Sequence, residues 1–362
     1  MALELKNLHK SFGPLPVVDD VSLSVAGGEI VVIFGASGTG KTVLLRILAG
    51  IHDVDAGAIL VDGRDVTDES PDARGIGMAF QNFALFPHMS AFDNVASPLT
   101  AQKRPRAEIA ARVGAIAKLL KIEPVLGHFP SELSNGQKQR TALARALVGE
   151  PKVLLLDDPL RNVDAKLRYE MRLELPNLLK KSGSAVLYVT QDYREAMALG
   201  DRIALLSKGK IVQLAPPTEI YERPATLEAA RLFGDPTINL VAVKPSAAAH
   251  GTCVRLANSS IQLGLGYDHA VGQACMLGLR PETIQLREEQ GENAFPVDIV
   301  AETPLNEKTV VLTRIADGTE ILVSRPSAVA GVADGRAYAA IDPQAALLFD
   351  AGNGRLIERS LQ

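Results

Sequence analysis

One short glycine-rich segment limits what this chain can fold into. It matches the pattern G-x-x-x-x-G-K-[ST] and runs Gly35, Ala36, Ser37, Gly38, Thr39, Gly40, Lys41, Thr42. The apolar run EIVVIF precedes it, and VLLRILA, with apolar residues at helical spacing, follows it. This pattern is typical of a buried parallel strand joined by a loop to a helix. Glycines let backbone N–H groups curl around a phosphate, and the N-terminus of the helix adds partial positive charge.

The segment predicts an α/β domain that binds a nucleotide. We expect Lys41 to reach the β and γ phosphates and the Thr42 hydroxyl to bind Mg²⁺. A second buried strand, VLLL, ends at Asp157, where a carboxylate can hold Mg²⁺ through water. A glycine-rich turn is the structural alternative, and Asp at a strand end is common by itself. Chance produces the glycine pattern in roughly one chain in a hundred of this length, so the two features together favour a nucleotide site.

Composition and charge narrow the possible partners. The chain has 362 residues, of which 47% are hydrophobic and 22% charged, which fits a soluble globular protein with two domains. Lys and Arg number 38 against 42 Asp and Glu, a net charge of −4 that disfavours nucleic acid as the main partner. No apolar run approaches the roughly 20 residues that span a bilayer, and the N-terminal residues lack the features of a signal peptide. Cys253 and Cys275 make neither a disulfide framework nor a metal cluster, so we expect a cytosolic chain.

Two regions of the chain differ in pattern. In the first, a third apolar strand, AVLYVT, ends at Gln191, and residues 105–148 have a mostly helical composition, which indicates an α/β core. From about Pro236 apolar and polar residues alternate instead. TVVLTRI and EILVSR flank an Asp-Gly turn at 316–319, a hairpin signal, and several such strands suggest a small β-barrel or sandwich. We therefore expect one domain at 1–236 and a second at 237–362.

Three further segments follow the glycine-rich loop. Gln81 lies in MAFQNFALFPHMS, LSNGQKQR occupies 133–140 at the start of a helix, and RNVDAKLR occupies 161–168. In this order they resemble the Q-loop, signature motif and D-loop of the ATP-binding subunits of ABC importers, of the carbohydrate, polyol and glycerol type exemplified by the maltose-transporter ATPase. The resemblance implies a P-loop NTPase fold, an ABC ATPase core with a helical subdomain, followed by an all-β, OB-like TOBE regulatory domain, which LGLRPETIQL and the later strands resemble.

The resemblance also implies how the site works. Two such domains pack head to tail and hold ATP and Mg²⁺ between the phosphate loop of one and the signature motif of the other. The resemblance implies that Phe12 stacks on the adenine and that Thr42, Gln81 and Asp157 bind Mg²⁺. The signature residues would contact the nucleotide of the partner domain, in trans; they are Ser134, Asn135, Gly136 and Gln137. Asp164 would belong to the D-loop. Residues 83–89 would form part of a groove for a helix of the membrane partner. Without the resemblance, Phe12 could be a core residue, LSNGQ a helix cap, and Gln81 a solvated side chain.

Departures from the family pattern bear on catalysis. The family has Glu where this chain has Asp158, and His where it has Gln191, and both positions surround the attacking water. Asp is a base of similar strength but about 1.5 Å shorter, and Gln donates a hydrogen bond without carrying charge. Asn135 stands where the family has Gly, although Asn tolerates left-handed backbone, and Arg161 replaces a small residue. We expect ATP binding to persist and hydrolysis to be weakened.

Together these features predict the ATP-binding, energy-coupling subunit of an importer for a small polar solute such as a sugar, a polyol, glycerol or glycerol phosphate. The expected partners are two transmembrane permease subunits, a second ABC ATPase subunit and, indirectly, a solute-binding protein, at the cytoplasmic face of the plasma (inner) membrane. The expected ATPase pair is a heterodimer in which this chain is the weakened half. A fully active homodimer and a non-hydrolysing regulatory subunit stay open. A soluble ABC protein of DNA repair or translation is disfavoured, because the phosphate loop and signature occur only once.

Overall fold

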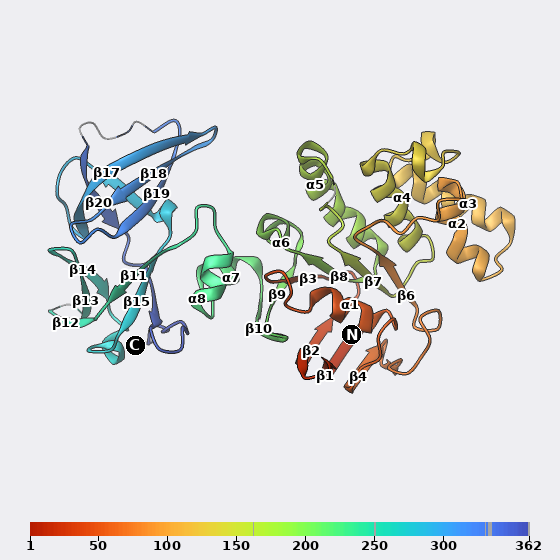
Figure 1. The fold of residues 1–362 in the computed structure, drawn as a ribbon, viewed down its shortest axis with the longest axis horizontal. Coiled ribbons are helices and arrows are strands. Elements are labelled where there is room, and N and C mark those ends of the chain that lie inside the picture. The colour runs from red at the N-terminus through yellow and green to blue at the C-terminus, as the bar shows by residue number, and fades with distance from the viewer. Residues whose placement is uncertain (162, 250, 330, 332–334, 361–362) are drawn as a thin grey trace. The chain divides into compact units, whose positions relative to one another are not determined.

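The computed structural model describes residues 1–161, 163–249, 251–329, 331 and 335–360. The chain separates into two compact units, Met1–Pro217 and Thr218–Gln362 (Figure 1). Residues 218–236 group with the C-terminal unit by their internal contacts, and the domain boundary expected after residue 236 stays a prediction. No helix in the described part of the chain has the length and apolar character needed to cross a membrane.

A six-stranded sheet, ordered β10-β9-β3-β8-β7-β6, forms the centre of the N-terminal unit. Its strands are β3 (Ile30–Phe34), β6 (Ile76–Ala79), β7 (Val153–Asp157), β8 (Ala185–Thr190), β9 (Arg202–Ser207) and β10 (Lys210–Ala215). The strands expected from EIVVIF, VLLL and AVLYVT are confirmed as β3, β7 and β8, which pair in parallel. All their residues are buried, because both faces of the sheet are covered. Their carboxyl ends meet at one edge, so the segments that follow them converge there.

A second sheet of this unit is antiparallel and ordered β2-β1-β4-β5. Its strands are β1 (Leu3–Phe12), β2 (Leu15–Val25), β4 (Ala56–Val61) and β5 (Arg64–Asp65). Their buried residues, such as Leu5, Leu23 and Ile59, belong to one hydrophobic core with residues of β3 and β7. The two sheets of the N-terminal unit therefore share a core, which supports the loop after β3.

Some helices flank the parallel sheet, and others form a group beyond one end of it (Figure 1). They are α1 (Lys41–Leu48), α2 (Ala91–Ala101), α3 (Arg106–Leu119), α4 (Asn135–Leu147), α5 (Ala165–Ser182) and α6 (Tyr193–Leu199). The group of α2, α3 and α4 is the helical subdomain. Two short 3₁₀ turns, Glu123–Val125 and Pro130–Glu132, separate α3 from α4, so the stretch expected to be mostly helical is interrupted there.

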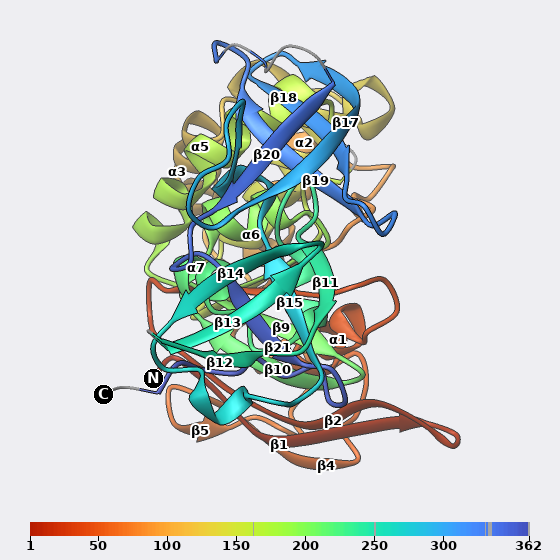
Figure 2. The same cartoon turned by 90° about the vertical axis from the view of Figure 1, so that its left-hand side faces the viewer.

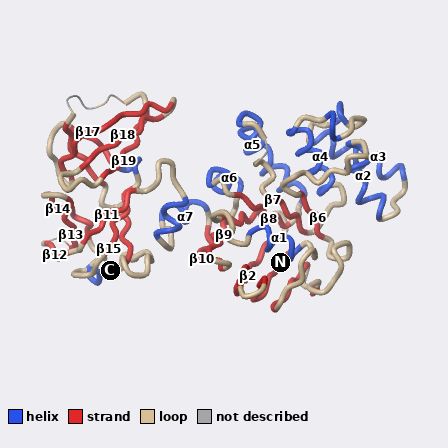
Figure 3. The backbone as a smooth tube through the Cα atoms, viewed as in Figure 1, coloured by secondary structure: helices blue, strands red, loops and turns tan. Residues whose placement is uncertain are grey.

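The C-terminal unit is built mostly of strands (Figures 2 and 3). In the described residues its strands form three sheets, ordered β11-β15-β21, β12-β13-β14 and β16-β20-β17-β18-β19. The strands are β11 (Asn239–Val243), β12 (Ser246–Ala248), β13 (Gly251–Leu256), β14 (Ser259–Gly264), β15 (Cys275–Leu279), β16 (Ile284–Arg287), β17 (Ala294–Leu305), β18 (Lys308–Arg314), β19 (Glu320–Pro326), β20 (Arg336–Ile341) and β21 (Leu347–Asp350). Its helical segments are α7 (Pro217–Glu222), α8 (Leu227–Leu232) and the 3₁₀ turns Asp268–Ala270 and Pro281–Thr283. The expected hairpin is confirmed as β18 and β19, in register from Lys308 opposite Pro326 to Arg314 opposite Glu320.

Candidate functional site

The glycine-rich segment forms a loop between β3 and α1, as the sequence predicts. Gly40 precedes α1 with a left-handed backbone, at a φ of 99°. A Cβ added to Gly40 would lie 2.5 Å from the carbonyl oxygen of Val17. Only glycine meets both conditions without strain, so the close approach of the loop to β2 depends on it.

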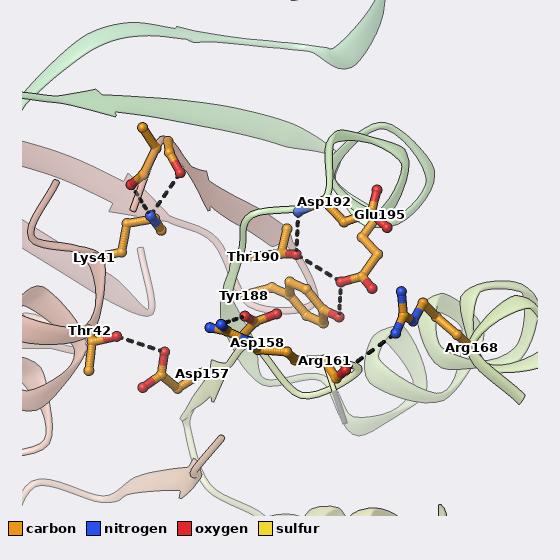
Figure 4. Close-up of polar contacts among 12 residues, drawn as sticks. Lys41, Thr42, Asp157, Asp158, Arg161, Arg168, Tyr188, Thr190, Asp192 and Glu195 are labelled. Carbon is orange, nitrogen blue, oxygen red and sulfur yellow. Dashed lines mark hydrogen bonds and ion pairs between the residues drawn. The ribbon is translucent and has the colours of Figure 1, made fainter. Parts of the chain in front are cut away.

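Lys41 is buried beneath its own loop (Figure 4). Its Nζ donates hydrogen bonds to the carbonyl oxygens of Gly35 at 2.8 Å and Ala36 at 2.6 Å, and it lies 3.4 Å from Thr39 Oγ1. Burial lowers the pKa of the ammonium group, and the carboxylates of Asp158 and Asp157, at the end of β7, oppose that shift. The loop thus places a cation beside backbone N–H groups at a helix N-terminus, an arrangement that suits phosphate.

Thr42 and Asp157 bring oxygen ligands together at the end of β7. The Thr42 hydroxyl donates a hydrogen bond to Asp157 Oδ1 at 3.1 Å. Asp157 is buried, and burial raises the pKa of its carboxyl group, although the Thr42 hydrogen bond and nearby cations lower it. Gln81 follows β6 and lines the same cavity. A hydroxyl, a carboxylate and an amide oxygen form a donor set that fits Mg²⁺.

Half of the predicted residues line one cavity of about 310 Å³. They are Ser37, Gly38, Gly40, Lys41, Thr42, Gln81, Asp157, Asp158 and Gln191. Gly35, Ala36 and Thr39 belong to the same loop and contact Lys41 instead. The structure therefore brings together side chains that are 150 residues apart in the sequence, because their strands share one sheet edge.

Asp158 and Gln191 reach this cavity from the ends of neighbouring strands. Asp158 has a left-handed backbone, at a φ of 46°, and its N–H donates to the carbonyl oxygen of Val189 at 2.9 Å. Burial raises the pKa of its carboxyl group, against the charge of Arg161. Arg161 Nη1 lies 3.6 Å from Asp158 Oδ2, and Arg161 lines the cavity too (Figure 4). Sequence reasoning noted Arg161 only as a departure and missed this ion pair, for which the spacing of three residues is the available signal.

A buried polar cluster lies next to Gln191. Tyr188 Oη and Thr190 Oγ1 each donate to Glu195 Oε2 at 2.9 Å, and the Asp192 N–H donates to Thr190 Oγ1 at 3.0 Å (Figure 4). Burial raises the pKa of the Glu195 carboxyl and that of the Tyr188 phenol. Glu195, like Asp158 and Gln191, lines a second cavity of about 400 Å³. Sequence reasoning missed Glu195, which lies one helical turn after Gln191.

The signature residues begin α4 and do not line either cavity. Ser134 Oγ accepts a hydrogen bond from the Gln137 N–H at 3.3 Å, and Gln137 Oε1 accepts one from the Ser134 N–H at 2.8 Å, which makes a capping box. Asn135 is the first residue of α4 and has a helical backbone, so the left-handed conformation considered for it is not adopted. Because the chain turns at the Ser134 cap, residue 135 is already inside the helix. Gly136 is buried.

Phe12 and Asp164 also lie outside these cavities. Phe12 ends β1 and is 46% exposed, with its ring edge-on to His52 at 5.7 Å between centroids, so it is not a core residue. Asp164 is exposed, and its carbonyl oxygen accepts a hydrogen bond from the Arg168 N–H at 2.9 Å at the start of α5. Asn162, which lies in the same sequence motif, falls outside the described residues.

The segment 83–89 is a loop that two polar side chains hold in place. Arg145, on α4, donates to two carbonyl oxygens of this loop at 2.7 and 3.1 Å. Asn94, on α2, is fully buried, accepts from the Phe86 N–H at 2.8 Å and donates back to the Phe86 carbonyl oxygen at 3.1 Å. The Phe86 side chain stays 42% exposed. Sequence reasoning missed Arg145 and Asn94, because both act on backbone atoms.

Two family models match the chain. A model described as ABC transporter covers residues 18–161, and a model described as TOBE domain covers residues 277–349. The first contains the glycine-rich loop, Gln81, the signature segment and Asp157. The second lies within the β-rich C-terminal unit.

Curated relatives match over nearly the whole length. The sn-glycerol-3-phosphate import ATP-binding protein UgpC of Paracoccus denitrificans is 40% identical over 356 residues, 98% of each chain. The spermidine/putrescine import ATP-binding protein PotA of Chromobacterium violaceum is 40% identical over 340 residues, 91% of this chain and 93% of that protein. The alpha-glucoside transport ATP-binding protein AglK of Rhizobium meliloti is 41% identical over 289 residues, 79% and 80% of the two chains.

A solved structure matches part of the chain. The dimeric post-hydrolysis state of the ATP-binding cassette MJ0796 bound to ADP and Pi aligns with a TM-score of 0.54 and 31% identity. It covers 59% of this chain and 98% of that one.

Proposed function

The chain belongs to the ATP-binding subunits of ABC importers, and from that premise we propose that it binds Mg-ATP and couples it to the import of a small polar solute. One observation carries the proposal. Lys41, Thr42, Asp157 and Gln81 line one cavity at the carboxyl edge of the parallel sheet. Asp158 and Gln191 face the same cavity.

Each residue then has a chemical task. The loop 35–42 binds the phosphates through its N–H groups and Lys41, and Phe12 stacks on the adenine. Thr42, Gln81 and Asp157 would hold Mg²⁺, and the metal when bound neutralises phosphate charge. Asp158 takes the proton of the attacking water, and Gln191 orients that water through a hydrogen bond.

The two departures make this chain a slow ATPase. The Asp158 carboxylate is one methylene shorter than Glu and has Arg161 beside it, and Gln191 cannot carry charge. Misplacement of a reacting group by about 1 Å costs roughly a hundredfold in rate. We therefore propose that this chain is the weakened half of a pair whose second ATPase subunit supplies the faster site.

The assembly follows from the family. In a head-to-tail pair, Ser134, Asn135, Gly136 and Gln137 would complete the partner's site, with Asp164 at the subunit contact. The exposed loop 83–89 would receive a cytoplasmic helix from one of two permease subunits. The chain would thus be held at the cytoplasmic face of the inner membrane, and a solute-binding protein would act on the far side. The C-terminal TOBE domain, placed by the sequence at 237–362, would regulate the pair.

The solute class rests on the relatives. Proteins named for sn-glycerol-3-phosphate and alpha-glucoside import support a sugar, polyol, glycerol or glycerol phosphate. A relative named for spermidine and putrescine shares the architecture at a similar identity. The solute contacts the permease and the binding protein rather than this chain, so the identity of its solute has to be read from those partners.

Mg-ATP hydrolysis by the purified chain, with nucleotide binding measured in parallel, tests the proposal. We expect nucleotide to bind, Lys41→Ala to weaken that binding at least about tenfold, and hydrolysis to stay near the Lys41→Ala background, because Lys41 holds phosphate while Asp158 activates water poorly. Failure to bind nucleotide would overturn the function itself.

A fully active homodimer is the second candidate. Burial raises the pKa of the Asp158 carboxyl, which makes it a stronger base than an exposed Asp, and the matched solved cassette is a dimer. Hydrolysis that depends on Lys41 and reaches roughly 1 s⁻¹ or more, the range of ordinary enzymes, would establish this candidate. Binding without hydrolysis, even after the second ATPase subunit is added, would instead favour a regulatory subunit.

A further inference from the structure

Arg161 is a second cation in the nucleotide cavity. Among the described residues that line it, Lys41 and Arg161 carry positive charge, and Lys41 already donates to carbonyl oxygens of its own loop. The Arg161 side chain is 53% exposed. Its ion pair with Asp158 is 3.6 Å long, which exceeds the roughly 2.8 Å of a close charge-assisted hydrogen bond. A guanidinium has five N–H donors, so one loose pair leaves donors for another anion.

Hydrogen bonds hold the backbone of Arg161 itself. Its N–H donates to the carbonyl oxygen of Asp158 at 3.2 Å. From α5, Arg168 Nη2 donates to the carbonyl oxygens of Arg161 at 3.3 Å and Val163 at 3.0 Å (Figure 4). These bonds anchor the backbone N–H and carbonyl oxygen of Arg161 itself, so less freedom is lost when the side chain binds a ligand than for an unanchored residue.

The Arg161 side chain points toward the phosphate loop. In Figure 4 the Arg161 side chain runs past Asp158 and ends on the side where Lys41 and Thr42 lie. The loop 35–42 holds phosphates from one side of the cavity. Arg161 lines the same cavity as that loop, together with Asp158 and Gln191.

We propose that Arg161 is a ligand of the terminal phosphate of the bound nucleoside triphosphate, supplied by the same chain as the phosphate loop. The planar guanidinium matches two phosphate oxygens at once, and a dianionic phosphate competes well with the loose carboxylate pair. Arg161 therefore makes this chain distinguish triphosphate from diphosphate. The inference rests on the proposed function, because it needs nucleotide in this cavity.

Binding of a non-hydrolysable ATP analogue (AMP-PNP) and of ADP, each with Mg²⁺, to the full-length chain tests the proposal. Arg161→Ser should weaken AMP-PNP binding about ten- to a hundredfold, the range for a lost hydrogen bond to a charged group, and leave ADP binding within about twofold. Arg161→Lys should recover part of the loss, because a point charge remains without the planar fork. Arg194→Ser is the matched control, because it removes a cation from neighbouring α6 that lines neither cavity.

The outcomes separate the inference from the function. If Arg161→Ser weakened the binding of AMP-PNP and ADP equally, or weakened the binding of neither, the role of Arg161 would be overturned. An Arg194→Ser effect as large as that of Arg161→Ser would also overturn it, because it would point to general electrostatics. Lys41→Ala, measured alongside, should weaken the binding of both nucleotides. Unchanged binding in Lys41→Ala would instead overturn the placement of the nucleotide in this cavity. Equal thermal unfolding midpoints for the variants ensure that the binding losses are local.

Discussion

At residue scale, we expect the Asp158 carboxylate to limit the rate that this chain can reach. Its backbone is left-handed and tied to Val189 across the β7–β8 pair, so the short side chain cannot be advanced by a backbone shift without breaking that hydrogen bond. Gln191 enters the cavity from the neighbouring strand. The distance and charge of these two side chains, rather than phosphate binding, are expected to limit hydrolysis.

Asp158→Glu combined with Gln191→His should raise the rate of hydrolysis about ten- to a hundredfold. The longer carboxylate recovers about 1.5 Å of reach, and His adds a group that exchanges protons near neutral pH. Phosphate release is the measurement, with Lys41→Ala in the same background as the blank.

The two single variants are the controls for this gain. We expect each alone to give a smaller gain than the pair, because both groups act on the same water. An unchanged rate in the double variant would show that the defect lies at another departure, such as Asn135.

Only part of the site could be predicted from residues alone. Lys41, Thr42 and Asp157 could be predicted to meet, because a phosphate loop and the end of a parallel strand share one sheet edge. The pairing of Arg161 with Asp158 has only the spacing of three residues as a signal, which is weak because the segment is a turn that follows a left-handed Asp158 and not a helix. Non-glycine residues adopt that conformation too rarely for a sequence pattern to predict it.

At the scale of the element, the phosphate loop depends on its close approach to β2. Gly40→Ala should destabilise the N-terminal unit by about 2 to 4 kcal/mol, since the new Cβ adds a left-handed strain and meets the carbonyl oxygen of Val17. Urea unfolding followed by circular dichroism measures the change.

Gly114→Ala is the matched control for this loss. Gly114 lies inside α3, and a Cβ added there meets nothing within 4 Å. The free energy of unfolding of this variant should rise by about 0.5 to 1 kcal/mol, because alanine has a higher helix propensity than glycine. A Gly40→Ala variant as stable as the wild type would contradict the steric argument.

The turn between β8 and α6 carries a pH dependence. Burial raises the Glu195 pKa, so above the ordinary Glu pKa the folded state keeps a proton that the unfolded state has lost. Stability therefore falls as pH rises from that ordinary value to the raised one. The Gln side chain of Glu195→Gln has no proton to lose. The free energy of unfolding of this variant should therefore rise relative to that of the wild type across this pH window, by at most about 1.4 kcal/mol per pH unit.

Urea unfolding of both proteins between pH 4 and pH 8 measures the gap, which is the difference in their free energies of unfolding. The gap should widen and then level off once the folded carboxyl is ionised. Gln keeps an acceptor for Tyr188 and Thr190, so the polar contacts are matched. A gap that stays constant with pH would mean that Glu195 does not titrate there.

Elements differ in how far the sequence determines them. β3, β7 and β8 are unbroken apolar runs and could be predicted because strands covered on both faces need no alternation. The β18–β19 hairpin could be predicted from its Asp-Gly turn. The β1–β2 pair could not, because register shifts after Leu5, Leu8 and Lys10 interrupt the alternation on which such a prediction depends.

At the scale of the whole molecule, Arg280 ties the start of the C-terminal unit to its strands. Its buried guanidinium donates to the carbonyl oxygen of Phe233 at 2.7 Å and to that of Tyr221, and it stacks on the Tyr221 ring at 3.5 Å from the centroid. Removing residues 218–236 would take away both carbonyl acceptors and the stacked ring from the Arg280 guanidinium.

A fragment of residues 218–362 should therefore be more stable than one of 237–362, by about 2 to 4 kcal/mol. Urea midpoints of the two fragments measure the difference. Arg280→Met should narrow the gap, because it removes the charge that the shorter fragment leaves unpaired. Equal stabilities would place the domain boundary after residue 236, as the sequence composition suggests.

The hydrogen bonds of Lys41 have a consequence for how nucleotide arrives. Because the ammonium group already donates to Gly35 and Ala36, an incoming phosphate meets an internal competitor and has to exchange with two carbonyl oxygens. We therefore expect association to proceed as a ligand exchange, slower than a diffusion-limited encounter. The same two bonds tie Lys41 to the start of its own loop, so the loop is cross-linked before a phosphate arrives.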